Sequence, residues 1–187
     1  MDFIQRDKTS LVVIDMQERL MSVIPELSRQ SVTKNAGILV ESAKTLGIPI
    51  IVTEQYPKGL GLTIPEIKEI IGNDISPIEK VVFSCGRSPE FNSALKETNK
   101  QEVLICGIET HVCVLQTVID LVNDGYTVYV PADAVTSRKG LDWERGVRLI
   151  ERAGAVVGTT ETFLFQLLER AGTEEFKKIS KLIKERG

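Results

Sequence analysis

Histidine and cysteine are scarce in this sequence. Its 187 residues include one histidine, His111, and three cysteines, Cys85, Cys106 and Cys113. The cysteines form no Cys-x-x-Cys pair, and a zinc site of the usual kind needs several such ligands. Their odd number and irregular spacing also argue against a disulfide framework. We therefore expect reduced thiols, no disulfide and no metal site built on these residues.

Long hydrophobic runs and an excess of positive charge are also missing. The apolar runs Leu11–Ile14 and Val103–Ile105 have the length of strands, far below that of a membrane span. Residues 1–10 are mostly polar and lack the apolar segment of a signal peptide. The net charge of −3 gives little general attraction for nucleic acid. These absences predict a cytoplasmic protein with no membrane partner and no nucleic-acid partner.

What the sequence does contain is a regular alternation of apolar, strand-like runs with helical patterns. Hydrophobic residues make up 42% of the chain, enough for a sizeable core. We expect strands at residues 10–16, 48–55, 80–84, 102–108, 127–131 and 155–159, and helices at 26–45, 89–98, 111–124, 140–152, 161–170 and 174–186. This order is typical of an α/β, three-layer α-β-α fold with a six-stranded, mostly parallel sheet. We predict one domain over residues 1–187, with the irregular stretch 56–65 as a candidate functional loop.

Asp15 directly follows the apolar strand residues Val12, Val13 and Ile14. In open α/β sheets, functional sites gather at the carboxyl ends of the strands. A carboxylate in this position is a candidate base. The structural alternative is a helix N-cap or a loop carboxylate.

Cys113 lies where the predicted strand 102–108 gives way to a helix. At a helix N-terminus, the dipole and free N–H groups stabilise a thiolate, and the same N–H groups can receive an oxyanion. The alternative is a small buried apolar residue, which is the interpretation that we favour for Cys106 inside the strand. Cys85 follows a predicted strand and is a candidate for the wall of a pocket.

Lys80 opens the predicted strand 80–84. Alone it would be taken for a surface lysine, but beside a carboxylate and a thiol its charge would favour the thiolate. We interpret His111 as a residue near the site, because its closeness to Cys113 in sequence does not make it a base. Fingerprints of dinucleotide binding, phosphate loops and serine-hydrolase elbows are missing.

Three segments together resemble the isochorismatase-like cysteine hydrolases: Val12–Gln17, the pair Glu79-Lys80, and Gly107–Val114. The resemblance extends from about Thr9 to Phe163. The segment Thr53–Gly61 is similar to the branch called isochorismatase domain-containing proteins. The family implies a Rossmann-like fold with a parallel sheet.

By this resemblance, Asp15, Lys80 and Cys113 form a catalytic triad that cleaves a C–N bond of a small amide through a thioester. It also implies a cis peptide bond between Ile108 and Glu109, and an oxyanion hole made by the amides of Glu109 and Cys113. Four residues are candidates for the substrate pocket: Gln17, Leu20, Tyr56 and His111.

The resemblance implies no cofactor. Nicotinamidases of the superfamily hold a metal with an aspartate and histidines after the second strand, where this chain has Glu54-Gln55-Tyr56. The partners implied are a small-molecule substrate and further copies of the chain, in a homodimer or homotetramer. Two alternatives to catalysis stay open, namely a silent scaffold on the same fold and a redox-sensing thiol protein.

Overall fold

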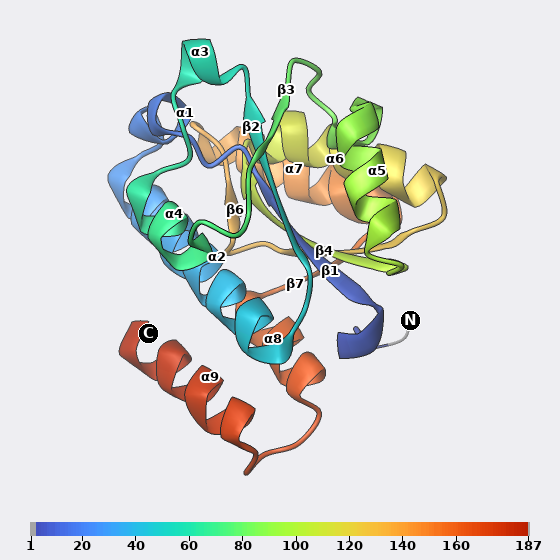
Figure 1. The fold of residues 1–187 in the computed structure, drawn as a ribbon. Coiled ribbons are helices and arrows are strands. Elements are labelled where there is room, and N and C mark those ends of the chain that lie inside the picture. Colours follow the sequence, from blue (N-terminus) through green and yellow to red (C-terminus); the bar gives the residue numbers. More distant parts are fainter. Residues whose placement is uncertain (1–2, 187) are drawn as a thin grey trace.

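The computed structural model describes residues 3–186, and its centre is one parallel β-sheet (Figure 1). The strand order is β3-β2-β1-β4-β5-β7, and the short strand β6 pairs with β4 outside this path. The strands are β1 (Thr9–Ile14), β2 (Ile50–Gln55), β3 (Ile78–Lys80), β4 (Glu102–Ile108), β5 (Thr127–Pro131), β6 (Val135–Thr136) and β7 (Val156–Gly158). All pairs of neighbouring strands are parallel.

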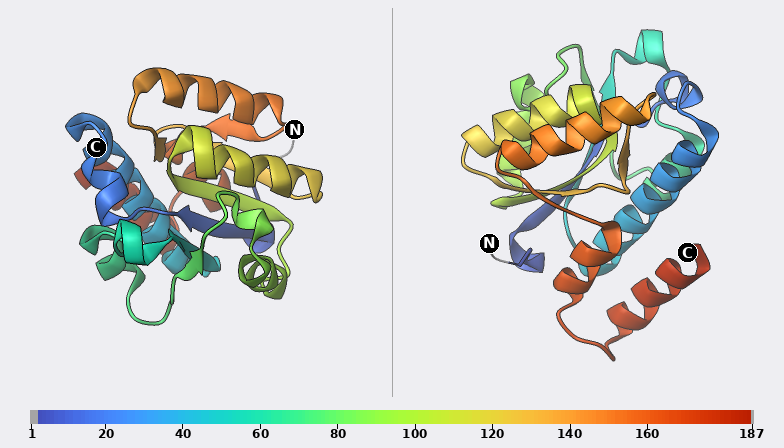
Figure 2. Two further views of the ribbon diagram at one scale, coloured as in Figure 1. Left: turned by 90° about the horizontal axis from the view of Figure 1, so that it is seen from above. Right: turned by 180° about the vertical axis from the view of Figure 1, so that it is seen from behind.

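Helices cover both faces of the sheet, and the two layers can be followed in Figure 2. They are α1 (Glu18–Ser22), α2 (Glu26–Leu46), α3 (Pro57–Leu60), α4 (Pro65–Ile71), α5 (Pro89–Glu97), α6 (Leu115–Asn123), α7 (Gly140–Arg152), α8 (Thr160–Leu168) and α9 (Glu174–Arg186), with the short turns η1 (Arg6–Lys8), η2 (Cys85–Arg87) and η3 (Thr110–Val114). Helices α2, α4, α8 and α9 pack on one face, and α5, α6 and α7 pack on the other. Successive side chains of β1 point to opposite faces of the sheet: Val13 packs in the core under α2, and Val12 packs in the core under α6. Every residue of the strand is therefore buried.

The predicted fold class is confirmed, with three corrections. The sheet has seven strands in residues 3–186, not six, because the two-residue β6 carries no apolar run that a pattern could reveal. The third strand is Ile78–Lys80, so Lys80 ends the strand instead of opening it. The apolar residues that follow leave the sheet, and Val81 is 76% exposed. The predicted irregular stretch 56–65 contains helix α3.

Gly107 allows the ends of β1 and β4 to approach closely. It pairs with Ile14 and has a φ of +124°, which favours glycine. A Cβ atom at this position would lie 2.0 Å from the carbonyl oxygen of Ile14. The glycine therefore brings Asp15, which follows β1, next to the chain that leaves β4. Within residues 3–186, no helix is long and apolar enough to cross a membrane.

Candidate active site

Asp15 and Lys80 form a buried ion pair at the carboxyl ends of the strands. Asp15 follows β1 and Lys80 is the last residue of β3, with β2 between them in the sheet. The distance from Lys80 Nζ to Asp15 Oδ2 is 2.6 Å, and both side chains are fully buried. The pair places one positive and one negative charge in a space without solvent, where each depends on the other.

The Lys80 ammonium is surrounded by oxygen acceptors. Besides Asp15, it donates to Gln55 Oε1 at 2.7 Å and to the carbonyl oxygens of Phe83 and Val82 at 3.1 and 3.3 Å. Burial lowers the pKa of Lys80, but the charge and hydrogen bond of Asp15, together with the charges of Cys85 and Cys113, outweigh this, and the pKa lies above its ordinary value of 10.5. Lys80 is therefore a fixed positive charge.

Two side chains of β2 hold the pair, and sequence analysis did not identify them. Thr53 Oγ1 donates to Asp15 Oδ1 at 2.7 Å, and Gln55 binds Lys80. Asp15 itself has a φ of +50°, an unusual conformation for a residue other than glycine. Three consecutive polar residues, Thr53, Glu54 and Gln55, at the carboxyl end of an apolar strand are the signal that could have found them.

Cys113 lies in the π-helical turn η3, before α6, and not in the first turn of an α-helix as predicted. The residue is 6% exposed. Burial raises the pKa of its thiol above the ordinary value, and the negative charge of Asp15 adds to this effect, while Lys80 opposes it. Burial and the Asp15 charge both favour the neutral thiol, so the stabilisation of a thiolate by a helix N-terminus stays a prediction.

The turn around Cys113 starts with the cis peptide bond between Ile108 and Glu109. The carbonyl oxygen of Glu109 accepts hydrogen bonds from the amides of Val112 and Val114, on either side of Cys113. This arrangement belongs to the π-helical turn, and it fixes the backbone from Glu109 to Val114 as one unit. Amides in such a turn can receive a negatively charged oxygen.

The other two cysteines have different surroundings. Cys85 is buried beside the site, with its sulfur 3.8 Å from Thr53 Oγ1, and burial raises its pKa to about 11. Cys106 points into the core on the α2 side of the sheet, where burial raises its pKa to about 12. All three cysteines are free.

The four candidate pocket residues have different surroundings. Gln17 is buried, and its amide is occupied by Gln55 N, Gln55 O and Gly61 O. Leu20 packs against the core on the α2 side, and His111 Nδ1 lies 2.9 Å from Ser137 Oγ. Tyr56 is 54% exposed and lines a cavity of about 470 Å³ that also includes Lys80. Since the Lys80 side chain is fully buried, its backbone faces that cavity.

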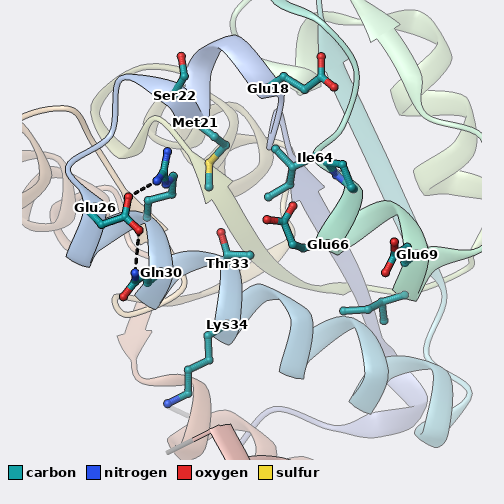
Figure 3. A pocket seen from close by; sticks show the side chains of 13 residues that line it. Glu18, Met21, Ser22, Glu26, Gln30, Thr33, Lys34, Ile64, Glu66 and Glu69 are labelled. Atoms are coloured by element: carbon teal, nitrogen blue, oxygen red, sulfur yellow. Dashed lines mark hydrogen bonds and ion pairs between the residues drawn. The ribbon is translucent and has the colours of Figure 1, made fainter.

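A larger cavity, of about 870 Å³, lies elsewhere (Figure 3). It is bounded by α1, by the first part of α2 and by the start of α4, and no triad residue lines it. Its wall carries carboxylates from all three helices, such as Glu18, Glu26 and Glu66. Glu26 is already bound to Arg29 and Gln30. In the described part of the chain, no three His, Cys, Asp or Glu side chains are grouped to hold a metal.

Comparison with known proteins identifies relatives over most of the chain. Residues 9–162 match the model of the isochorismatase domain. The chain is 40% identical over 179 residues to the secreted isochorismatase effector Isc1 of Phytophthora sojae, covering 94% of this chain and 84% of that protein. It is 38% identical over 176 residues to isochorismatase domain-containing protein 2 of Bos taurus, covering 94% of this chain and 82% of that protein. Because the Phytophthora relative is named as secreted, the cytoplasmic location stays a prediction.

Solved structures share the fold. The MAR1 ribonuclease from Caenorhabditis elegans has a TM-score of 0.90 and 38% identity, covering 98% of this chain and 93% of that one. The YcaC gene product of Escherichia coli, described as an octameric hydrolase of unknown specificity, has the same TM-score at 22% identity, which shows the fold alone. The resemblance predicted from the sequence is confirmed, and the chain belongs to the isochorismatase family.

Proposed function

We propose that the protein is a cysteine hydrolase that cleaves a C–N bond of a small amide, with Cys113 as nucleophile. The observation that carries the proposal is the buried pair of Asp15 and Lys80, 2.6 Å apart, whose charges both act on the Cys113 thiol. A buried ion pair is costly to maintain. Its position beside a sulfur nucleophile at the carboxyl edge of the sheet gives it a chemical use.

Burial and the Asp15 charge favour the neutral form of the Cys113 thiol, so the reaction begins with a proton transfer. Asp15 accepts the proton of Cys113 as the sulfur attacks the carbonyl carbon. The amides of Glu109 and Cys113 receive the negative oxygen of the intermediate. The protonated Asp15 then gives its proton to the departing amine, which leaves the acyl group on sulfur as a thioester.

Water completes the cycle. Asp15 accepts a proton from the water that attacks the thioester, and the products are a carboxylic acid and the free thiol. Lys80 keeps its proton throughout, because its surroundings hold its pKa above the ordinary value. Its role is to favour the anionic forms of Asp15 and Cys113 in turn.

The proposed reaction uses no metal. In the nicotinamidase pattern the ligands lie at the end of the second strand, where this chain has Glu54 and Gln55 as the last residues of β2 and Tyr56 directly after it. Glu54 Oε1 accepts hydrogen bonds from the backbone N and Oγ1 of Thr63, both at 2.7 Å. Gln55 binds Lys80. These side chains are committed to structural contacts, and their donor set differs from the one that holds zinc.

Ammonia or amine release from a panel of small amides, ureides and imides tests the proposal. Wild type is expected to hydrolyse at least one compound, and Cys113→Ser is expected to be slower by about 10³-fold or more because its oxygen is a poorer nucleophile in this site. Cys106→Ser is the matched control, since Cys106 faces the other core, and should retain the activity. Equal rates for wild type and Cys113→Ser would favour the scaffold alternative.

An RNA substrate belongs in the same panel, because the Caenorhabditis elegans neighbour is described as a ribonuclease. The net charge of −3 favours a small molecule over a polyanion. We therefore expect no Cys113-dependent cleavage of RNA. RNA cleavage by the wild type that Cys113→Ser loses would replace the small amide as the substrate class.

We also propose that the chain forms a homo-oligomer. Several large apolar side chains are exposed, among them Leu27 at 82%, Val81 at 76% and Leu141 at 62%. Burial of such residues in a symmetric interface would remove apolar surface from water. Static light scattering measures the mass in solution, and a monomer at micromolar concentration would contradict this proposal.

A further inference from the structure

Two consecutive residues after β6 contact the turn that carries Cys113. Glu109 Oε1 accepts hydrogen bonds from the backbone N and from Nε of Arg138, both at 3.0 Å. One residue earlier, Ser137 Oγ lies 2.9 Å from Nδ1 of His111. The segment Ser137–Arg138 therefore holds the turn on both sides of Thr110.

The ion pair between Glu109 and Arg138 is shielded from solvent at its Glu109 end. The Glu109 side chain is 9% exposed, whereas the Arg138 side chain is 56% exposed. Two donors from one residue bind a single carboxylate oxygen, and one of them is a guanidinium nitrogen, so the bond is charge-assisted. A carboxylate held in this way limits rotation of the Glu109 backbone, because the side chain and the peptide share one Cα.

Helix α7 fixes the same turn from a second direction. A Cβ atom at Gly146 would lie 3.0 Å from Thr110 Cγ2 and 3.1 Å from the backbone N of His111. The helix thus packs against the turn without space for a methyl group. His111 also has its Nε2 4.0 Å from Asp142 Oδ2 in the first turn of α7. Among these contacts, only that of Arg138 is made to Glu109, the residue whose backbone amide is proposed to bind the oxyanion.

We infer that Arg138 is a positioning residue that sets the orientation of the Glu109 peptide for oxyanion binding. The inference rests on the proposed function, since it assigns Arg138 to the same reaction. Arg138 acts through Glu109 and need not touch the substrate. Loss of the guanidinium contact would leave only the backbone N–H of residue 138 on Glu109 Oε1 and would let the Glu109 amide move. A displacement of about 1 Å in an active site can cost about 10²-fold in rate.

Two electrophiles separate this role from a general effect on Cys113. p-Nitrophenyl acetate transfers its acetyl group to sulfur with release of p-nitrophenol, and the attack passes through an oxyanion. Iodoacetamide alkylates the sulfur at a saturated carbon, where the S–C bond forms as iodide leaves, and this attack forms no oxyanion. For Arg138→Met we expect acetylation of Cys113 to fall about 10- to 100-fold, with alkylation within about twofold of wild type.

Matched variants complete the experiment. Arg138→Lys keeps the charge and is expected to recover part of the acetylation rate. Arg148→Met removes another exposed arginine, which pairs with Glu144 on α7 at 2.9 Å, and is expected to leave both rates unchanged. An equal fall of both rates in Arg138→Met, or no fall in either, would overturn the inference. A wild type that is never acetylated on Cys113 would overturn the proposed function as well, so the two failures are distinguishable.

Discussion

The Lys80→Met variant is expected to lose about 3–5 kcal/mol of unfolding free energy relative to the wild type. Methionine has a similar length but no charge, so it would leave the fully buried Asp15 carboxylate without its partner. Gln55 and the carbonyl oxygens of Val82 and Phe83 would also lose their common donor. Urea unfolding followed by circular dichroism measures the difference.

A double variant and an exposed lysine serve as controls. Lys80→Met combined with Asp15→Asn should recover part of the loss, because no buried charge is then unpaired. Lys177→Met breaks a pair with Glu174 on the surface and should change little. A loss for Lys80→Met as small as that for Lys177→Met would show that the buried pair contributes nothing to stability.

The pH dependence of this difference has a defined sign. The pKa of Lys80 is raised in the folded protein, so its contribution is fully present below the ordinary value of 10.5 and is lost as pH rises through the raised pKa. The stability gap between wild type and Lys80→Met should be constant between about pH 7 and pH 9 and narrow only above pH 10.5.

Asp15→Asn is expected to change two rates in opposite directions. Amide hydrolysis should fall about 10²- to 10⁴-fold, because the base and acid of the proposed reaction is lost. Alkylation of Cys113 by iodoacetamide at pH 8 should become faster. Asp15 raises the pKa of the Cys113 thiol whereas Lys80 lowers it, so removal of the carboxylate charge shifts the balance toward thiolate.

The comparison must be made at Cys113 itself. Cys85 and Cys106 are fully buried, and Cys113 is slightly exposed, so unequal labelling of the three thiols would reflect access as well as activation. Mass spectrometry of the Cys113 peptide, at a temperature where circular dichroism shows a folded protein, avoids this. If alkylation slowed together with hydrolysis, the loss of Asp15 as the base for the Cys113 proton would outweigh the fall in the thiol pKa, and the expected shift toward thiolate would be wrong.

Much of the fold could be predicted from local chemistry. Apolar runs such as Leu11–Ile14 have no alternation, and in a parallel sheet covered on both faces none is required. The strand β6 was missed because pairing with β4, and not the sequence of Val135–Thr136, defines it. The third strand was misplaced because the apolar residues after Lys80 were taken as its body, whereas they lie outside the sheet and Val81 is largely exposed.

The candidate site was predictable where the residue type itself is reactive. Asp15, Lys80 and Cys113 carry groups with obvious chemistry, and the resemblance to the family predicted that they belong to one site. Thr53, Gln55 and Arg138 carry no group of comparable reactivity, and their roles depend on which group the fold places within 3 Å of them. A sequence also shows a helix start but not the depth of burial, which raises the pKa of the Cys113 thiol.

Acetylation of the wild-type protein by p-nitrophenyl acetate, followed over time by peptide mass spectrometry, tests most directly whether Cys113 is the nucleophile. If Cys113 is the nucleophile, one acetyl group forms on its sulfur within the first minutes and is then removed by water as the thioester hydrolyses. A protein that carries the acetyl group on another residue, or that remains unmodified while Cys113 is reduced, would contradict it.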